Sequence, residues 1–205
     1  MGQTGAMRTL DDERVGHRRR IIGLAGCPGS GKSTLAAGLA AAAPDTSIVV
    51  PMDGFHLAQR DLDRLGRANR KGAPDTFDVD GYVALLELLR ATPDRVVDAP
   101  AFDRHLEEPV PAAIAIEPRH TTIITEGNYL LHDADGWERV HPLLDECWFV
   151  DCEATTRTAR LVTRHVEHGR TDDEARDWVR EVDEPNARLI GAGIARADRI
   201  VRTDR

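Results

Sequence analysis

Residues 21–34 read IIGLAGCPGSGKST, an apolar run followed at once by a glycine-rich stretch, a lysine and two hydroxyl residues. The stretch fits the pattern G-x-x-x-x-G-K-[ST] of a phosphate-binding loop. Glycines let backbone N–H groups turn toward phosphate oxygens, and the N-terminus of the following helix adds positive potential. In this pattern the lysine reaches the β- and γ-phosphates, and the first hydroxyl is a ligand for Mg²⁺. We therefore expect ATP or GTP with magnesium at Gly26, Cys27, Pro28, Gly29, Ser30, Gly31, Lys32, Ser33 and Thr34.

Further apolar runs, rich in Ile and Val, have the composition of buried parallel strands. Five runs are strong and one is weaker. The strong runs are 21–26, 47–52, 121–126, 146–151 and 198–203, and the weaker run is 95–100.

Helical patterns lie between these runs. Residues 33–43 are rich in Ala and Leu, and apolar residues within 82–89 recur at i, i+3, i+4 and i+7. Thr171 with Glu174 forms a capping box that starts another helix. Residues 60–78 are polar, with Gly and Pro, and indicate a long loop or an irregular helix. Alternating strands and helices predict an α/β fold. Together with the phosphate loop, they indicate a three-layer P-loop NTPase fold with a central parallel sheet of about five strands and a small helical lid.

The length and charge of the chain narrow its organisation and its partners. The 205 residues are enough for one domain, over 19–205, after a flexible tail, 1–18. A formal net charge of -8 argues against a general nucleic-acid binder, which needs a basic face. Three cysteines without CxxC spacing give no disulfide framework or zinc site. No stretch reaches membrane-spanning length, and we expect a cytoplasmic protein.

Two acids follow predicted strands at the same edge of the sheet. Asp53 directly follows the run 47–52, and Glu126 is the last residue of the run 121–126. Ligands of an open α/β sheet bind beyond the carboxyl ends of its strands, so both acids are expected to face the phosphate loop. Asp53 is then placed to take the proton of an acceptor hydroxyl, and Glu126 to hold Mg²⁺ with Ser33. The alternatives are an Asp-Gly turn and a solvent-facing acid, and which acid is the base stays open.

Arginines recur after the fourth strong run, in TTRTARLVTRHVEHGRTDDEARDWV. Arg157, Arg160 and Arg164 have helical spacing, and Arg170 lies in the following turn. Taken alone, such a run is a solvated basic face. Beside a phosphate loop and two acids, it predicts a lid over about 157–182 whose guanidinium groups stabilise charge on a transferring phosphoryl group. Arg160 is assigned to nucleotide binding, and Arg164 and Arg170 to catalysis.

Nucleotide binding is compatible with three classes of protein. A GTPase switch normally carries an N/T-K-x-D motif after a late strand, and ECWFVDCEAT (146–155) has no such lysine. An ABC-type ATPase needs a serine-glycine-glycine motif, which the sequence lacks. A small-molecule kinase needs a carboxylate near the γ-phosphate and a cationic lid that excludes water, and the sequence has candidates for both. We expect a kinase, with a nucleotide-dependent switch or an ATPase module as the alternative.

These motifs resemble the phosphoribulokinase, uridine kinase and pantothenate kinase family of P-loop kinases, over roughly residues 20–203. GCPGSGKST, the acid in PMDGFH, TEGNYLL and the arginine lid occur in the family's order. KGAPDTFD (71–78), PAFDR (100–104) and DEPNARLI (183–190) are similar to segments of uridine and pantothenate kinases. PMDGFH, EGNYLL and DEPNA look most like bacterial nucleoside-kinase-like and fructose-transport-associated kinases.

The resemblance implies ATP as phosphoryl donor, a small molecule with a hydroxyl group as acceptor, and a possible homodimer. It implies that Lys32, Ser33, Asp53, Glu126 and the lid arginines are catalytic. It implies acceptor contacts from Asp53, His56, Arg104, Asn128 and Asn186.

Two departures from the uridine kinases bear on the acceptor. The position of their ribose-binding acid is Gly72, and the position of their stacked aromatic is Arg104. Both weaken a nucleoside assignment. Arg104 suits a carboxylate or phosphate, or else it pairs at the surface with Glu107 or Glu108. Pantothenate-like acids, sugars and nucleosides all stay open as acceptors.

Overall fold

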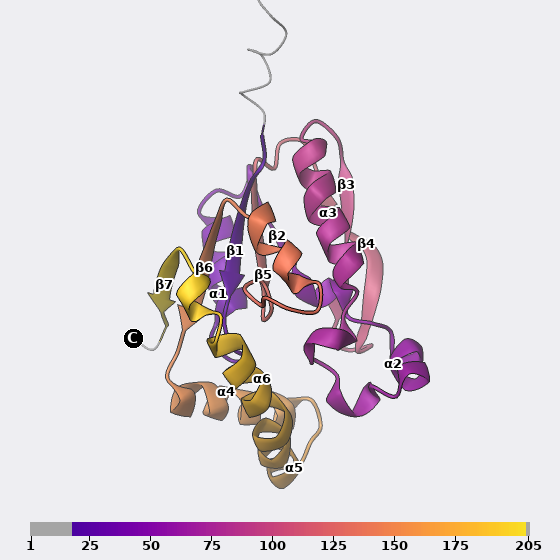
Figure 1. Cartoon of the computed structure of the whole chain (residues 1–205), viewed down its shortest axis with the longest axis vertical. Coiled ribbons are helices and arrows are strands. Elements are labelled where there is room, and N and C mark those ends of the chain that lie inside the picture. Colours follow the sequence, from indigo (N-terminus) through magenta and orange to yellow (C-terminus); the bar gives the residue numbers. More distant parts are fainter. Residues whose placement is uncertain (1–17, 204–205) are drawn as a thin grey trace, which may run out of the picture.

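Five parallel strands form the central sheet, in the order β2-β5-β1-β6-β7 (Figure 1). The computed structural model describes residues 18–203. The predicted tail therefore lies outside the described residues apart from Arg18. All five strong runs of the sequence form strands of this sheet, as expected. The strands are β1 (Arg20–Ala25), β2 (Ser47–Pro51), β5 (Thr122–Gly127), β6 (Glu146–Asp151) and β7 (Arg199–Arg202).

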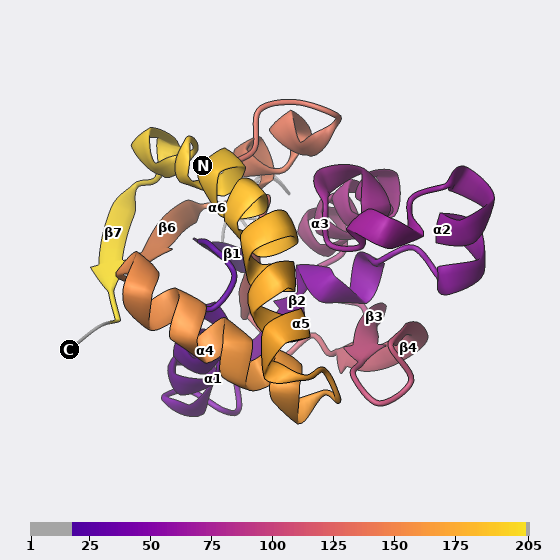
Figure 2. The same ribbon diagram turned by 90° about the horizontal axis from the view of Figure 1, so that it is seen from below.

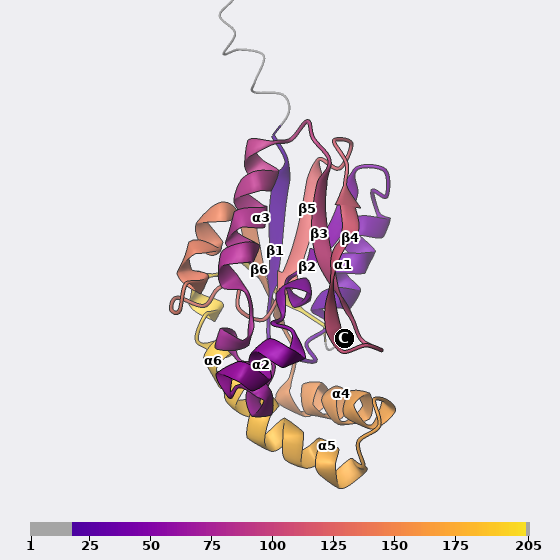
Figure 3. The same cartoon turned by 90° about the vertical axis from the view of Figure 1, so that its right-hand side faces the viewer.

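Helices cover both faces of the sheet, with α1 (Lys32–Ala41) on one and α3 (Val79–Ala91) on the other (Figure 3). Successive strand residues point to opposite faces. Ile21 and Ile123 belong to the apolar cluster under α3, and Ile22 and Ile124 to the cluster under α1. Because both faces are buried, the strands read as continuous apolar runs.

The apolar face of helix α3 holds the helix against the sheet. Tyr82 and Leu86 are fully buried, and burial of such a side chain contributes about 1.5–3 kcal/mol. The Tyr82 hydroxyl lies 2.6 Å from Thr125 Oγ1 in β5, which in turn donates to the Val50 carbonyl oxygen of β2 at 2.7 Å. The Asp78 side chain caps the first turn by accepting from a backbone N–H. The helix thus both covers the sheet and binds two strands together.

The weaker sixth run was wrongly expected to be a parallel strand. It forms β3 (Val97–Asp103), which pairs antiparallel with β4 (Glu108–Ile116) in a separate two-stranded sheet. The pairing register shifts between Ala99 and Ala101, at Pro100. Proline lacks the N–H that a continuous ladder needs, so it is tolerated at such a bulge.

The remaining helices lie at the carboxyl ends of the strands (Figures 1 and 2). Residues 60–78, expected to be a loop or an irregular helix, contain α2 (Gln59–Leu65) and two 3₁₀ turns, Ala68–Arg70 and Pro74–Thr76. No helix in residues 18–203 is long and apolar enough to cross a membrane.

The predicted lid, about 157–182, covers most of α4 (Ala154–Glu167), α5 (Asp172–Trp178) and most of a π-helical segment (Val179–Asp183), and α6 (Glu184–Gly191) follows it. The predicted capping box starts α5, because Thr171 Oγ1 accepts from the Glu174 N–H at 3.3 Å and the Glu174 carboxylate accepts in return. Pro185 has no N–H to give to the carbonyl one turn before it, which explains why the helix widens just ahead of it.

Candidate active site

The phosphate-loop segment, residues 26–31, connects β1 to α1 at the carboxyl edge of the sheet. Gly29 and Gly31 have φ angles of 78° and 90°, a left-handed conformation that glycine adopts without strain. A Cβ atom at Gly29 would lie 2.8 Å from the Arg157 carbonyl oxygen, so a side chain has no room there. No side chain caps α1 at Gly31, which leaves the first helical N–H groups available to an anion. The backbone fits a bound phosphate group.

Lys32 begins α1 and is buried, with 7% of its surface exposed. The hydrogen bond that its ammonium makes within the described residues goes to the Cys27 carbonyl oxygen, at 3.0 Å. Burial lowers the pKa of Lys32, and the negative charge of Glu126 partly opposes that effect. A buried ammonium with unused donors is costly unless an anion completes its hydrogen bonds. Lys32 therefore also fits a phosphate ligand.

Glu126 lies between Asp53, which follows β2, and the phosphate loop, which follows β1, because β5 lies between β2 and β1. It pairs in register with Pro51 of β2 and Leu24 of β1, so the three strand ends are level. Its carboxylate accepts a hydrogen bond of 2.8 Å from Ser33 Oγ. Burial raises the pKa of Glu126, and Lys32 partly lowers it. A hydroxyl and a carboxylate side by side are the oxygen ligands that Mg²⁺ prefers.

Asp53 follows β2 in a 3₁₀ turn, Met52–Phe55. Gly54 in this turn is required by close packing, because a Cβ atom there would lie 2.3 Å from the Pro100 carbonyl oxygen of β3. The Asp53 carbonyl oxygen accepts a hydrogen bond of 2.8 Å from His56 Nδ1. Asp53 and Gly54 thus do form a turn, and Asp53 also lines the cavity between the strand ends and the lid.

That cavity has a volume of about 780 Å³ and receives three arginines from the lid. Arg160 Nη1 donates to the Gly29 carbonyl oxygen of the phosphate loop at 3.4 Å. The guanidinium of Arg170 stacks on the ring of Trp178, 4.0 Å from its centroid. Arg164, which lies between these two arginines in the sequence, also lines the cavity. Three cations from the lid therefore line the cavity, and Arg160 is the one that contacts the phosphate loop.

Arg157, the first arginine of the same run, has a different environment. It is buried outside the cavity lining, and its guanidinium forms an ion pair with Glu184 at the start of α6. Two residues of the lid that sequence patterns did not single out together, His165 and Asp183, form a hydrogen bond of 2.8 Å. Asp183 is buried on the π-helical segment, a type of local distortion that is frequent at functional sites.

Apart from Arg157, every residue predicted for catalysis or for acceptor binding lines this one cavity, although the segments are far apart in sequence. Of the predicted nucleotide-binding residues, three are exceptions: Gly26, Cys27 and Ser30 form the inner side of the loop. The residues predicted for catalysis, acceptor binding or nucleotide binding that line the cavity are Pro28, Gly29, Gly31, Lys32, Ser33, Thr34, Asp53, His56, Arg104, Glu126, Asn128, Arg160, Arg164, Arg170 and Asn186.

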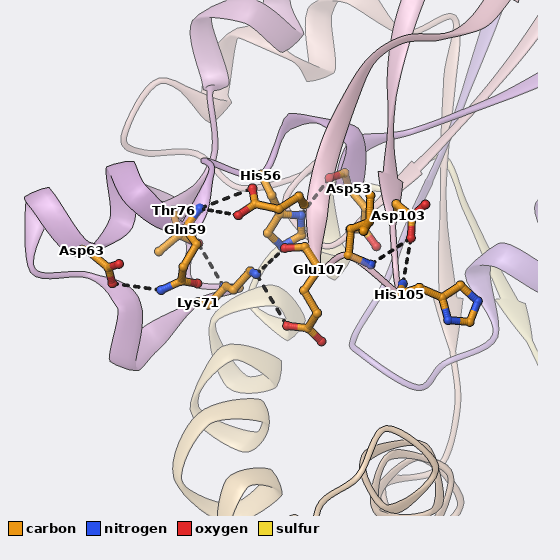
Figure 4. A network of polar contacts seen from close by, with 12 residues as sticks. Asp53, His56, Gln59, Asp63, Lys71, Thr76, Asp103, His105 and Glu107 are labelled. Carbon is orange, nitrogen blue, oxygen red and sulfur yellow. Dashed lines mark hydrogen bonds and ion pairs between the residues drawn. The ribbon is translucent and has the colours of Figure 1, made fainter.

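The acceptor side of the cavity contains groups that the sequence analysis missed (Figure 4). Lys71 donates to the Glu107 carbonyl oxygen at 2.8 Å and lies 5.3 Å from the Phe102 ring centroid. Arg104, one of the predicted contacts, pairs with Asp53 at 3.7 Å and not with Glu107 or Glu108. Lys71 stands in KGAPDTFD, one of the family-like segments, but its position against the hairpin β3–β4 depends on a strand that the sequence patterns did not predict.

A parallel sheet with a phosphate loop after β1, one acid just after β2 and another near the end of β5 defines a P-loop NTPase fold, and comparison with known proteins places the chain within it. No family model matches the sequence. A Schizosaccharomyces pombe protein named "Putative uridine kinase C227.14" is 38% identical over 175 residues, which cover 80% of this chain and 74% of that one. The crystal structure of a "putative fructose transport system kinase" from Silicibacter sp. TM1040 has 40% identity, a TM-score of 0.82 and 90% coverage of both chains. YFH7 of Saccharomyces cerevisiae, with a TM-score of 0.77 and 21% identity, shares the fold. The chain belongs to the uridine-kinase-like P-loop kinases.

Proposed function

We propose that this protein is an ATP-dependent kinase that transfers the γ-phosphoryl group of ATP to a hydroxyl group of a small molecule. The observation that carries the proposal is the level arrangement of phosphate loop, Glu126 and Asp53 at one sheet edge, under a lid with three arginines. Ligands of open α/β sheets bind at such an edge. Family membership supports ATP as the nucleotide.

Each group at this edge has a role that follows from its surroundings. The loop N–H groups and the Lys32 ammonium bind the phosphates, which supply the hydrogen bonds that Lys32 lacks. Ser33 and Glu126 would hold Mg²⁺, whose charge, when bound, offsets that of the phosphates. Arg160, next to the loop, belongs with the nucleotide.

Asp53 is the better of the two acids for the role of base. The Glu126 carboxylate already accepts from Ser33 and faces the Lys32 ammonium, whereas Asp53 is partly exposed in the cavity. Asp53 would orient the acceptor hydroxyl and accept its proton while that oxygen bonds to the γ-phosphorus and the bond to the β,γ-bridging oxygen breaks. Arg164 and Arg170 stabilise the charge on the transferring group, and ADP leaves with the bridging oxygen.

The test separates phosphoryl transfer from nucleotide binding. A coupled ADP-release screen against small hydroxyl compounds first identifies an acceptor. Single-turnover transfer by Asp53→Asn is then measured beside ATP·Mg²⁺ affinity. We expect transfer to fall by roughly 10²–10⁴-fold, toward the lower end because proton loss is late, with little change in affinity.

Three outcomes would contradict this assignment. Loss of ATP·Mg²⁺ binding in Asp53→Asn would make Asp53 a metal-site residue, and unaffected transfer would leave it a turn residue. Slow hydrolysis without any acceptor, together with a conformation set by the bound nucleotide, would favour a switch.

A further inference from the structure

Two guanidinium groups from different parts of the fold line the cavity together with Asp53. Arg104 comes from the β3–β4 turn, and its Nη2 lies 3.7 Å from Asp53 Oδ2. Arg164 comes from α4 and, within residues 18–203, has no carboxylate at ion-pair distance and no side-chain hydrogen bond. Burial lowers the pKa of Arg164, and the neighbouring Arg104 charge lowers it further. Arg104 therefore faces Asp53 at a distance too long for a strong hydrogen bond, and Arg164 lines the same cavity.

The turn that carries Arg104 is held in place from both sides. Asp103 Oδ1 accepts hydrogen bonds from the backbone N–H groups of His105, at 2.8 Å, and Leu106, at 3.0 Å (Figure 4). Glu107 has a φ of 54°, a left-handed conformation that is unfavourable for a glutamate and persists only where its surroundings fix it.

Lys71 supplies part of that support. Its side chain is 17% exposed, and its ammonium binds the Glu107 carbonyl oxygen at 2.8 Å and lies 3.6 Å from the Glu107 carboxylate. The Gln59 N–H adds a bond of 3.1 Å to the Glu108 carboxylate. The turn is thus tied to the segment 59–72, so Arg104 is presented to the cavity by a fixed loop.

The charges around Asp53 do not balance during the proposed reaction. Asp53 accepts the hydroxyl proton, so it no longer offers a full negative charge to Arg104. The transferring phosphoryl group occupies Arg164 and Arg170 in the lid. Glu107, whose side chain is 65% exposed, pairs with Lys71 and not with Arg104. An anionic group on the acceptor would give Arg104, whose side chain is 51% exposed, a partner during transfer.

We propose that the acceptor is a small hydroxy compound with an anionic group, a carboxylate or a phosphate, and that Arg104 binds this group with Lys71 beside it. This inference rests on the proposed kinase function. Because Arg104 and Asp53 are 3.7 Å apart, the anionic group and the reactive hydroxyl lie only a few bonds from each other. The anionic group is unchanged by the reaction and serves to position the hydroxyl against Asp53.

The experiment compares matched acceptors that differ in charge. ADP release with ATP·Mg²⁺ is measured for glycerate against glycerol, pantothenate against panthenol, and ribose 5-phosphate against ribose. We expect an anionic member of at least one pair to be preferred, by roughly 10- to 100-fold in kcat/KM, the range for a hydrogen-bonded charge. The carboxylate and phosphate pairs distinguish the two sources of charge.

Variants then assign the preference to Arg104. Arg104→Gln is expected to raise KM for the preferred acceptor by roughly tenfold or more while KM for ATP changes less than about twofold, and Arg104→Lys to restore part of the loss. Arg64→Gln, on the exposed side of α2, is the matched control and should change neither constant.

Each other outcome overturns the inference. Equal or better turnover of the neutral members would refute an anionic acceptor and leave the kinase function standing. A lower kcat with unchanged acceptor KM in Arg104→Gln would assign Arg104 to the phosphoryl group. If neither class is phosphorylated by protein that binds ATP, the inference and the proposed function both fail.

Discussion

At the scale of single residues, Lys32 and Glu126 share one physical difficulty, since each is a charged group that the fold buries. Burial disfavours the charged form of both, and each partly relieves the other. Neither has a reason to be buried for stability alone, because apolar side chains would pack there at lower cost. On the proposed function, a ligand whose phosphates and metal ion complete the arrangement would explain their position.

For Lys32 the first prediction is that Lys32→Ala abolishes phosphoryl transfer and leaves the protein folded. The lysine lies at the N-terminus of α1 with a single backbone partner, so its loss removes a phosphate contact and not a core contact. Circular dichroism checks the fold, and single-turnover transfer checks the chemistry. Unchanged turnover with a good acceptor would refute the phosphate-loop assignment.

For Glu126 the second prediction is a stability effect with a defined pH dependence. Its folded-state pKa is raised above the ordinary 4.5, so ionisation in the folded protein carries a cost. That cost is absent below pH 4.5 and grows as the pH rises through the folded-state pKa. Glu126→Gln avoids it, so the melting temperature of the variant without nucleotide should exceed that of the wild type at neutral pH.

Melting temperatures of both proteins from pH 4 to pH 8 check this prediction. The difference between variant and wild type should shrink as the pH falls, while phosphoryl transfer at neutral pH is lost. Glu87→Gln, at an exposed position of α3, is the control for the substitution itself. A variant that is less stable at neutral pH than at acidic pH, relative to wild type, would contradict the argument.

At the scale of elements, we propose that the lid is the part that moves. Gly169 joins α4 to α5 with a φ of 96°, and nothing lies within 4 Å of the position of a Cβ atom there. Arg170, next to it, contacts Trp178 of its own lid and not the phosphate loop. The joint is therefore open, and closure of the proposed lid would bring Arg170 toward the phosphate loop.

The third prediction is that nucleotide with acceptor protects residues 157–182 from hydrogen exchange much more than nucleotide alone. Closure over both substrates excludes water and brings the lid arginines onto the phosphates. Hydrogen exchange followed by mass spectrometry measures it, with α3 (Val79–Ala91) as the internal reference. Equal protection with and without acceptor would make the segment a fixed face.

The same scale separates what the sequence could predict from what it could not. The five buried strands and the loop 26–31 have strong local signals, because burial on both faces gives continuous apolar runs. The strand β4, EPVPAAIAI, has two prolines and a residue at positive φ, Ala112, so local propensity argues against a strand. Its pairing with β3 is a tertiary effect, and the position of Lys71 against the turn depends on it.

The lid gives a similar contrast. The capping box at Thr171 is a local signal, and the sequence predicted the start of α5 from it. The burial of Arg157 against Glu184 and the contact of His165 with Asp183 join segments that only the folded chain brings together. Spacing alone made the three arginines of α4 equivalent, and packing separates Arg157 from the other two.

At the scale of the whole molecule, the charge of the cavity is opposite to that of the chain. The chain has a formal net charge of -8, whereas six Lys or Arg side chains line the cavity against four Asp or Glu side chains. A local excess of cations, not the net charge, attracts small anions to a cleft. The excess arises because the fold brings the phosphate loop, the hairpin turn and the lid together at one edge of the sheet.

The last prediction follows from binding to the folded state alone. Since the site needs three separated segments in place, the unfolded chain does not form it, and ligand binding adds directly to stability. At a concentration of ATP·Mg²⁺ about 100 times its Kd, the gain is about 2.7 kcal/mol. For a chain of this size, that corresponds to a rise in melting temperature of roughly 5–10 °C.

Lys32→Ala should lose most of the rise, because it removes a phosphate contact, and Asp53→Asn should keep it, because that carboxylate serves the acceptor. Thermal melts of the three proteins with ATP, with GTP and with a magnesium chelator measure the effect and the choice of nucleotide. An equal rise in Lys32→Ala would mean that the nucleotide binds away from the phosphate loop, and a rise lost in Asp53→Asn would move that residue from the acceptor to the metal ion.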